Sequence, residues 1–237
     1  MSRLVIKFPS RNRPEKFKNV FTRYSTMLSG RHDVRFVVSM DEDDATMNNE
    51  SMWEWFETRK RNIDLKYCYG HSKTKIEACN ADLEGEDGDV LLLASDDMNP
   101  VINGYDGFIM EGFRQSFPDF DGAITFWDGL RPKADLLMTL AVIGFPLYRR
   151  FGYVYNPSYT SLFCDTEQTA VCLLLGKLRR TDVCIIKHEW TAEPFDALHA
   201  RNQDLKGFLI DKQTYETRKA RNFDLGDMIN AGTRKRD

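Results

Sequence analysis

Apolar residues gather in short runs along the chain, and the clearest run is Val90-Leu91-Leu92-Leu93-Ala94. Five consecutive apolar residues without polar alternation predict a strand that is buried on both faces, as in the middle of an α/β sheet. The run stops on Ser95-Asp96-Asp97, and Asn99-Pro100 then predicts a turn. In open α/β sheets the carboxyl ends of the strands face the ligand crevice, so these polar residues are expected there.

The pattern before this run alternates between the periods of strands and helices. We expect strands at 4–8, 34–40 and 63–67 and helices at 14–28 and 45–60. A third helix opens within 70–75, capped by Ser72 or Thr74, and keeps its apolar face to Leu83. Strands that alternate with helices predict a parallel sheet with right-handed crossovers. The expected fold is therefore α/β, with a mostly parallel, Rossmann-like central sheet flanked by helices.

The second half of the chain is less regular. We expect a helix at 101–113, a strand at 122–127, a broken strand and short helix within 132–150, and an aromatic loop at 152–159. A helix that starts near Asp165 and keeps its apolar side to Leu178, a last strand at 182–190 and a helical piece at 208–225 follow. The predicted organisation is one domain, 1–200, with a helical and locally basic extension, 201–237.

Composition indicates an ordinary globular protein. The chain has 237 residues, 42% hydrophobic and 29% charged, with a formal net charge of −3. Its five cysteines are scattered and form no C-x-x-C pair, which is typical of reduced core thiols. We see no signal peptide and no apolar run that could span a bilayer, so we expect a cytoplasmic protein without a membrane partner.

Several polar segments are predicted to share one edge of the sheet. They are Pro9, Ser10, Arg11 and Arg13 after the first strand, Asp41 after the second, Lys73 and Lys75 at a helix start, and Ser95-Asp96-Asp97. Two adjacent carboxylates at the end of a buried strand need a positive partner. A Mg²⁺ or Mn²⁺ ion carrying a diphosphate would supply it. The alternative is that Ser95, Asp96 and Asp97 only form a turn.

These segments resemble motifs of GT-A fold nucleotide-sugar glycosyltransferases, especially the family-2-like enzymes and the small ones of bacteriophages. Ser95-Asp96-Asp97 resembles their D-x-D motif, with Ser in the first place. The segment 73–80, KTKIEACN, resembles their K-x-x-A-x-N helix. Pro9-Ser10-Arg11 resembles the loop that cradles the base. The chain lacks a Q-x-x-R-W box.

The resemblance also implies roles later in the chain. Asp165-Thr166-Glu167 resembles the acidic motif with the catalytic base, and His188 resembles the late histidine that joins Asp97 in the metal shell. Asp96 would contact ribose or sugar, and Asp41 the base. Three alternatives stay open: Asp165 is only a helix N-cap, His188 is only a hydrogen-bonded surface residue, and Lys75 is only a solvated helix residue.

The implied reaction transfers a sugar from a nucleoside diphosphate sugar, with a UDP-sugar as first choice, to an acceptor hydroxyl. The resemblance to phage enzymes suggests hydroxymethylated pyrimidines in DNA, in the host cytoplasm, as acceptor. Tyr153, Tyr155 and Tyr159 are candidate stacking residues, or else a loop packed on the core. Candidate phosphate contacts are Lys206, Lys212, Arg218, Lys219, Arg221, Arg234, Lys235 and Arg236.

Other functions remain open at this stage. The acceptor can be a saccharide or a protein, and the protein can be a nucleotidyltransferase or a non-catalytic nucleotide-sugar-binding protein. A nucleotidyltransferase normally carries a glycine-rich loop after the first strand, and 9–13 contains no glycine. The sequence does not show whether the reaction inverts or retains configuration. It does not show the oligomeric state either.

Overall fold

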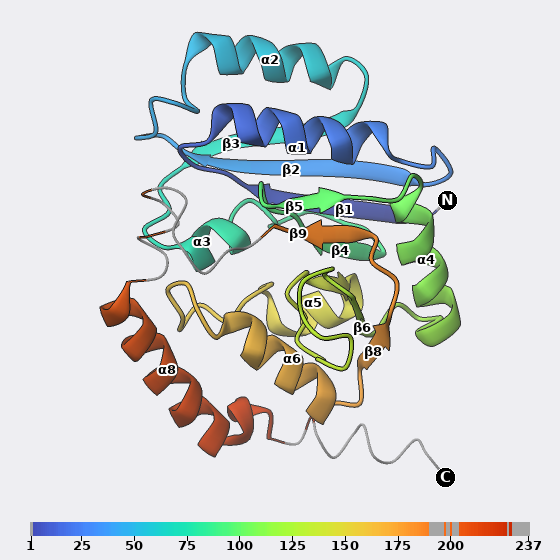
Figure 1. The fold of residues 1–237 in the computed structure, drawn as a ribbon, viewed down its shortest axis with the longest axis vertical. Helices are drawn as coiled ribbons and strands as arrows, with labels where there is room; N and C mark the ends of the chain where they lie inside the picture. The colour runs from blue at the N-terminus through green and yellow to red at the C-terminus, as the bar shows by residue number, and fades with distance from the viewer. Residues whose placement is uncertain (1, 190–196, 198–199, 201–203, 227, 229–237) are drawn as a thin grey trace.

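The computed structural model describes residues 2–189, 197, 200, 204–226 and 228. A seven-stranded sheet forms the centre of the molecule, with the strand order β3-β2-β1-β4-β7-β6-β8 (Figure 1). Its strands are β1 (Arg3–Pro9), β2 (Asp33–Asp41), β3 (Asp64–Gly70), β4 (Val90–Leu93), β6 (Ala123–Phe126), β7 (Val142–Gly144) and β8 (Leu178–Thr181). A separate two-stranded sheet pairs β5 (Met98–Pro100) with β9 (Ile186–His188).

The sheet is mostly parallel. Strands β1, β2, β3 and β4 run parallel to one another, and β6 runs parallel to β8, while β7 is antiparallel to both of its neighbours. All four residues of β4 are buried, as an unbroken apolar run predicts. The predicted α/β architecture, with one mostly parallel sheet flanked by helices, is confirmed.

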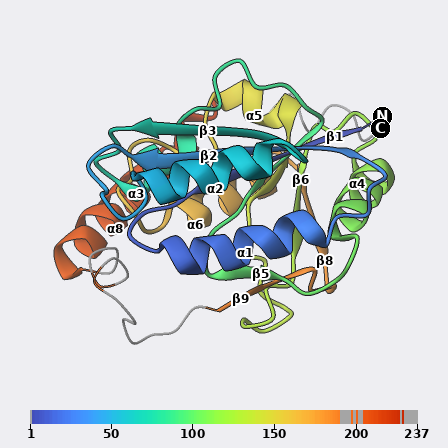
Figure 2. The ribbon, with the colours of Figure 1, turned by 90° about the horizontal axis from the view of Figure 1, so that it is seen from above.

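Helices cover both faces of the sheet. One core contains α1 (Pro14–Thr26), α2 (Glu50–Lys60) and α4 (Tyr105–Ser116), which pack on the face that carries Leu4, Ile6 and Phe8. Figures 1 and 2 both show α1 and α2 side by side. The other core contains α3 (Lys75–Asn80), α5 (Phe145–Phe151) and α6 (Cys164–Leu174), on the face of Val5 and Leu91. A last helix, α8 (Leu205–Ala220), packs beside α6 and is followed by the 3₁₀ turn η1 (Asn222–Asp224).

Some boundaries differ from the prediction for identifiable reasons. Leu178 belongs to β8, because Lys177 and Gly176 close α6 by bonds to Cys172 and Leu173 and the chain then turns into the sheet. Residues 182–185 lie between β8 and β9 and are not a strand. Helix α2 begins at Glu50, where the Asn49 side chain caps it, and α3 already ends at Asn80. The strand and short helix expected within 132–150 are β7 and α5.

The described helices include none that is long and apolar enough to cross a membrane. None of the five cysteines, which all lie among the described residues, forms a disulfide. Cys79, Cys164 and Cys172 are buried, as predicted for core thiols, whereas Cys68 and Cys184 are only partly buried.

Lys7 is a fully buried cation within the sheet, and the sequence pattern gave no sign of it. It lies on the same face of β1 as Val5, with 0% of its surface exposed. Its ammonium donates to Ser39 Oγ, and the Ser39 hydroxyl donates to the Asp82 carboxylate. Desolvation lowers the pKa of Lys7 to about 8, and Asp82 offsets only part of this shift.

This shift predicts a pH dependence of stability. Because the folded-state pKa is below the ordinary value of 10.5, the unfolded chain binds more protons between about pH 8 and 10.5. The contribution of Lys7 to the free energy of unfolding should therefore increase over this window, by up to about 3 kcal/mol. Urea unfolding of the wild type and Lys7→Met at pH 7.5 and 10 measures it. A stability difference that stays constant between the two pH values would contradict the prediction.

Candidate functional site

The carboxyl ends of β1, β2 and β4 bring the predicted polar segments together. Because the three strands are parallel, Pro9, Asp41 and the residues after Leu93 all lie at one edge of the sheet. Arg13 Nη1 contacts Asp96 Oδ1 at 2.9 Å, which joins the loop after β1 to the loop after β4. The sequence predicted that the segments after β1, β2 and β4 lie at this edge but not the ion pair between them.

Asp96 and Asp97 are adjacent but have different electrostatic environments. Desolvation raises the pKa of Asp96, Arg13 offsets part of that rise, and the negative charge of Asp97 adds to it. Desolvation also acts on Asp97, but His188, the Ser95 hydroxyl and Lys75 together hold the pKa of Asp97 well below its ordinary value. Asp97 is therefore a stable carboxylate with cationic and hydrogen-bonding neighbours.

The small β5–β9 sheet places His188 beside Asp97. Met98 pairs with His188, and the Glu189 N–H donates to the Asp97 carbonyl at 2.7 Å. The backbone N–H of His188 donates to the backbone carbonyl of Asp128 at 2.8 Å. His188 Nε2 lies 3.6 Å from Asp97 Oδ2, which is too long for a direct hydrogen bond. Two residues 91 positions apart in the chain thus present a ring nitrogen and a carboxylate oxygen to the same point.

This pair fits a divalent cation that also binds a diphosphate. The described residues contain no group of three or more His, Cys, Asp or Glu that could hold a metal by itself. Mg²⁺ and Mn²⁺ are commonly held by one or two carboxylates, while substrate phosphates and water complete the shell. Asp97 and His188 could supply two ligands of such a set, which phosphate oxygens and water would have to complete.

Lys75 is a charged neighbour of both Asp97 and Asp165. It is the first residue of α3, which Thr74 caps by accepting from the Glu77 N–H at 3.1 Å. Desolvation lowers the pKa of Lys75, but electrostatic interactions with its neighbours, among them the carboxylates of Asp97 and Asp165, outweigh it, so the net shift is upward. Lys75 is thus within electrostatic reach of both predicted site carboxylates, although its side chain keeps an exposed surface.

The interpretation of Asp165 as a helix N-cap is wrong. The N-cap of α6 is Phe163, with a left-handed backbone at φ 60°, and Asp165 is the second residue of the helix. Asp165 Oδ1 accepts from the Thr166 N–H at 2.8 Å, within the first turn. The carboxylate is partly exposed, and its negative charge contributes to the raised pKa of Lys75. Its role as a base remains a prediction.

Ser10, Arg11 and Asp41 form the part of the edge next to β2. Arg11 Nη1 lies 2.7 Å from Asp41 and 2.6 Å from Asp43, and Asp41 also accepts from the Ser72 N–H at 3.0 Å. The Ser10 hydroxyl oxygen is buried and has no hydrogen-bond partner among the described residues. An orphaned buried hydroxyl at a strand end is consistent with a missing ligand. Lys73 is exposed, and its backbone N–H donates to Glu77 at 2.7 Å.

The aromatic loop is core rather than a stacking surface. Tyr155 and Tyr159 are only 4% and 2% exposed, and Tyr153 is half-buried. Asn80 fastens this loop to α3, because its Oδ1 accepts from Val154 N and Tyr155 N and its Nδ2 donates to the Tyr155 carbonyl at 2.7 Å. The alternative reading of a loop packed on the core is the correct one for Tyr155 and Tyr159.

The candidate phosphate contacts are only partly available. Lys206, Lys212, Lys219 and Arg221 are exposed, whereas Arg218 is committed to an ion pair with Glu167 at 2.7 Å. Arg234, Lys235 and Arg236 lie outside the described residues.

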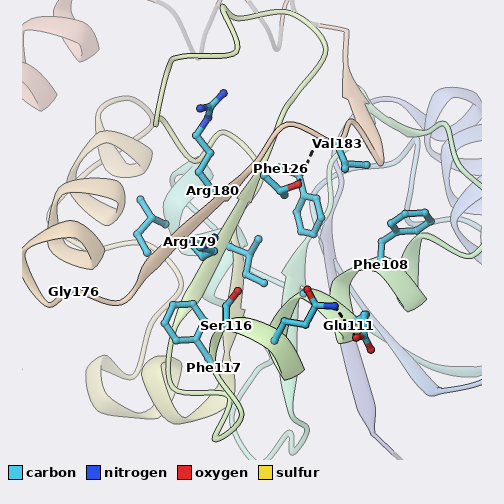
Figure 3. A pocket seen from close by; sticks show the side chains of 14 residues that line it. Phe108, Glu111, Ser116, Phe117, Phe126, Gly176, Arg179, Arg180 and Val183 are labelled. Atoms are coloured by element: carbon cyan, nitrogen blue, oxygen red, sulfur yellow. Dashed lines mark hydrogen bonds between the residues drawn. The ribbon is translucent and has the colours of Figure 1, made fainter. Parts of the chain in front are cut away.

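A large hollow of about 870 Å³ lies elsewhere, between α4, β6 and β8. Figure 3 shows Phe108, Phe117, Phe126, Arg179 and Arg180 around it. None of the predicted site residues lines it, so it takes no part in the strand-end site.

Comparison with solved structures identifies the fold. No known protein-family model matches the chain, and no curated protein matches it. A mannosyltransferase from Pyrobaculum calidifontis, solved with GDP-Man and Mn²⁺, is similar with a TM-score of 0.64 and 14% identity, over 98% of this chain and 74% of that one. S. aureus TarS 1-349 with UDP-GlcNAc has a TM-score of 0.61 and 13% identity, over 100% and 76% of the two chains.

A third similar structure is glucosyl-3-phosphoglycerate synthase from Mycobacterium tuberculosis with Mn²⁺, UDP and phosphoglyceric acid. It has a TM-score of 0.58 and 12% identity, over 88% of this chain and 78% of that one. Sequence identities of this size support a conclusion about the fold only. The chain has the GT-A-like fold of these glycosyltransferases.

Proposed function

We propose that the protein is a metal-dependent glycosyltransferase that moves a sugar from a nucleoside diphosphate sugar to an acceptor hydroxyl. The observation that carries this proposal is that His188 lies beside Asp97 at the carboxyl end of a strand in a GT-A-like sheet, with Lys75 within electrostatic range of Asp97 and of Asp165. The similar structures, solved with GDP-Man, UDP or UDP-GlcNAc and in two cases with Mn²⁺, support the same reading.

The donor site divides into a base end and a phosphate end. Ser10 and Asp41 would bind the base, because the unpaired Ser10 hydroxyl can donate or accept and the Asp41 carboxylate can accept a hydrogen bond at the polar edge of a nucleobase. Arg13 holds Asp96 in place at 2.9 Å for a contact with ribose or sugar. Lys75 would place its positive charge on the diphosphate.

Charge on the leaving group is the main electrostatic problem of the reaction. A Mn²⁺ or Mg²⁺ ion held by Asp97 and His188 would act as a Lewis acid toward the diphosphate. Lys75 adds a cation that stays protonated, because its pKa is raised by its anionic neighbours despite desolvation. In an inverting reaction Asp165 accepts the proton of the acceptor hydroxyl. In a retaining reaction the diphosphate takes that proton instead.

We propose a hydroxymethylated pyrimidine base of DNA as the acceptor, and a UDP-sugar as the donor. The exposed Lys206, Lys212, Lys219 and Arg221 support contact with a phosphate backbone. With Tyr155 and Tyr159 buried, only Tyr153 remains as a candidate stacking residue in the loop. A base in duplex DNA would have to flip or be single-stranded to reach the site.

A panel of nucleotide sugars tests this function directly. With Mn²⁺ or Mg²⁺ and no acceptor, we expect slow hydrolysis of at least one UDP-sugar that stops on chelation. Hydroxymethylpyrimidine DNA at two salt concentrations, followed by nucleoside mass analysis, then tests the acceptor. If no nucleotide sugar binds or is hydrolysed, the enzymatic proposal fails. If an oligosaccharide gains the sugar and DNA does not, only the DNA acceptor is rejected.

A further inference from the structure

Three consecutive backbone N–H groups before α6 point at one carboxylate of α8. Thr160 N donates to Asp211 Oδ1 at 2.9 Å, while Ser161 N and Leu162 N donate to Oδ2 at 2.9 and 2.8 Å. The Thr160 hydroxyl also lies 3.1 and 3.0 Å from the two oxygens. Asp211 is 0% exposed. Successive N–H groups of this kind form an anion-binding nest, and here the anion is a side chain of the C-terminal helix.

The next residue, Phe163, adopts a backbone conformation that needs external support. Its φ is 60° and its ψ is −6°, in the left-handed region that bulky residues rarely adopt. Its ring packs against two residues of α8, Phe208 at 5.4 Å and Tyr215 at 5.8 Å between ring centroids. Helix α8 therefore supplies both the anion and the apolar surface that fix the entry to α6.

A buried ion pair completes the attachment one turn further into α6. Arg218 Nε and Nη2 contact the two oxygens of Glu167 at 2.7 and 3.0 Å, and the Tyr159 hydroxyl donates to the same carboxylate at 2.7 Å. The side chains of Arg218 and Glu167 are 12% and 3% exposed. Removing one partner of a buried, doubly hydrogen-bonded pair leaves the other charge without compensation.

Asp165 lies between these two attachment points. It follows Phe163 by two residues and precedes Glu167 by two, in the first turn of α6. Phe208, Asp211, Tyr215 and Arg218 are spaced three, four and three residues apart, so they lie on one face of α8. Figure 1 shows α8 lying beside α6 at the edge of the molecule.

We propose that α8 is a positioning element of the active centre, in which Asp211 and Arg218 are positioning residues that orient the Asp165 carboxylate. The inference rests on the proposed glycosyltransferase function. It adds that the C-terminal helix, which packs against α6, sets the geometry of the proton-accepting step. A displacement of about 1 Å in a catalytic group can cost about 100-fold in rate.

Two variants and a control test this proposal. Asp211→Asn puts an amide NH₂ against N–H donors, and Arg218→Lys keeps the charge but loses the two-point contact with Glu167. Glu216→Gln changes an exposed charge of the same helix and is the control. We expect kcat of Asp211→Asn to fall about 10- to 100-fold. The Kd for UDP with Mn²⁺ should stay within about twofold, because Asp97 and His188 are untouched.

Amide hydrogen exchange gives a readout that does not depend on catalysis. Exchange of residues 160–167 should accelerate at least about tenfold in Asp211→Asn, less in Arg218→Lys and not in the control, while the central strands stay protected. If Asp211→Asn has the same kcat and the same exchange rates as Glu216→Gln, the proposal is overturned. It is also overturned if Asp211→Asn loses UDP binding to the same extent as it loses turnover. If Asp211→Asn does not fold, Arg218→Lys decides by the same measurements. If the wild type neither binds nor turns over a donor, the proposed function fails, and exchange still decides whether α8 positions 160–167.

Discussion

Asp97→Asn should abolish metal-dependent donor binding while the fold is retained. The change removes a negative charge at almost constant volume, and the structure holds the pKa of Asp97 well below its ordinary value, so that charge is present throughout the physiological pH range. An amide is a much weaker ligand for a hard divalent cation than a carboxylate. Calorimetric titration with UDP and Mn²⁺ should show a Kd increased at least about 100-fold.

The control for this measurement is Asp119→Asn, which removes an exposed charge from the turn between α4 and β6. It should bind UDP and Mn²⁺ as the wild type does. Both variants should unfold at urea concentrations close to that of the wild type. An unchanged Kd in Asp97→Asn would mean that Asp97 and His188 do not hold the cation, and the metal part of the proposal would then be rejected.

The sequence predicted the elements whose signal is local. The apolar run of β4 and the polar stop after it are read from neighbouring residues, and so are the alternating strands and helices up to Tyr67. Parallel pairing then follows from the βα order, which is why the segments after β1, β2 and β4 could be placed at one edge. The pairing of Arg13 with Asp96 is not local and could not be read from either segment alone.

Non-local contacts account for what the sequence did not show. His188 reaches Asp97 through β5 and β9, two strands of three residues each, which carry too few residues for a period to be recognised. Phe163 is a poor residue for a left-handed cap, and its ring contacts with α8 help to explain why it takes that role. The sequence predicted a helical piece at 208–225, but nothing in it indicated that Phe208, Asp211, Tyr215 and Arg218 would face buried partners.

Asp165→Asn should lose most turnover with little change in donor affinity or stability. As the second residue of α6, Asp165 is not the cap, so the substitution removes only a favourable charge in the first turn, worth about 0.3–1 kcal/mol. An Asn cannot accept the acceptor proton, and loss of a general base typically costs about 100- to 10,000-fold in kcat. Initial rates at saturating donor, with Kd for UDP and Mn²⁺ measured alongside, check this.

The matched control is Glu50→Gln, which removes an acidic residue from the first turn of α2. Its effect on thermal unfolding gives the helix-dipole contribution of one such charge, and its turnover should equal that of the wild type. If Asp165→Asn unfolds like this control and has lost its turnover, Asp165 acts as the base of an inverting reaction. If it keeps its turnover, the acceptor proton goes elsewhere, as in a retaining reaction where the leaving diphosphate accepts it. The stereochemistry of the product, compared with that of the donor, then has to show retention, and an inverted product would require a base other than Asp165.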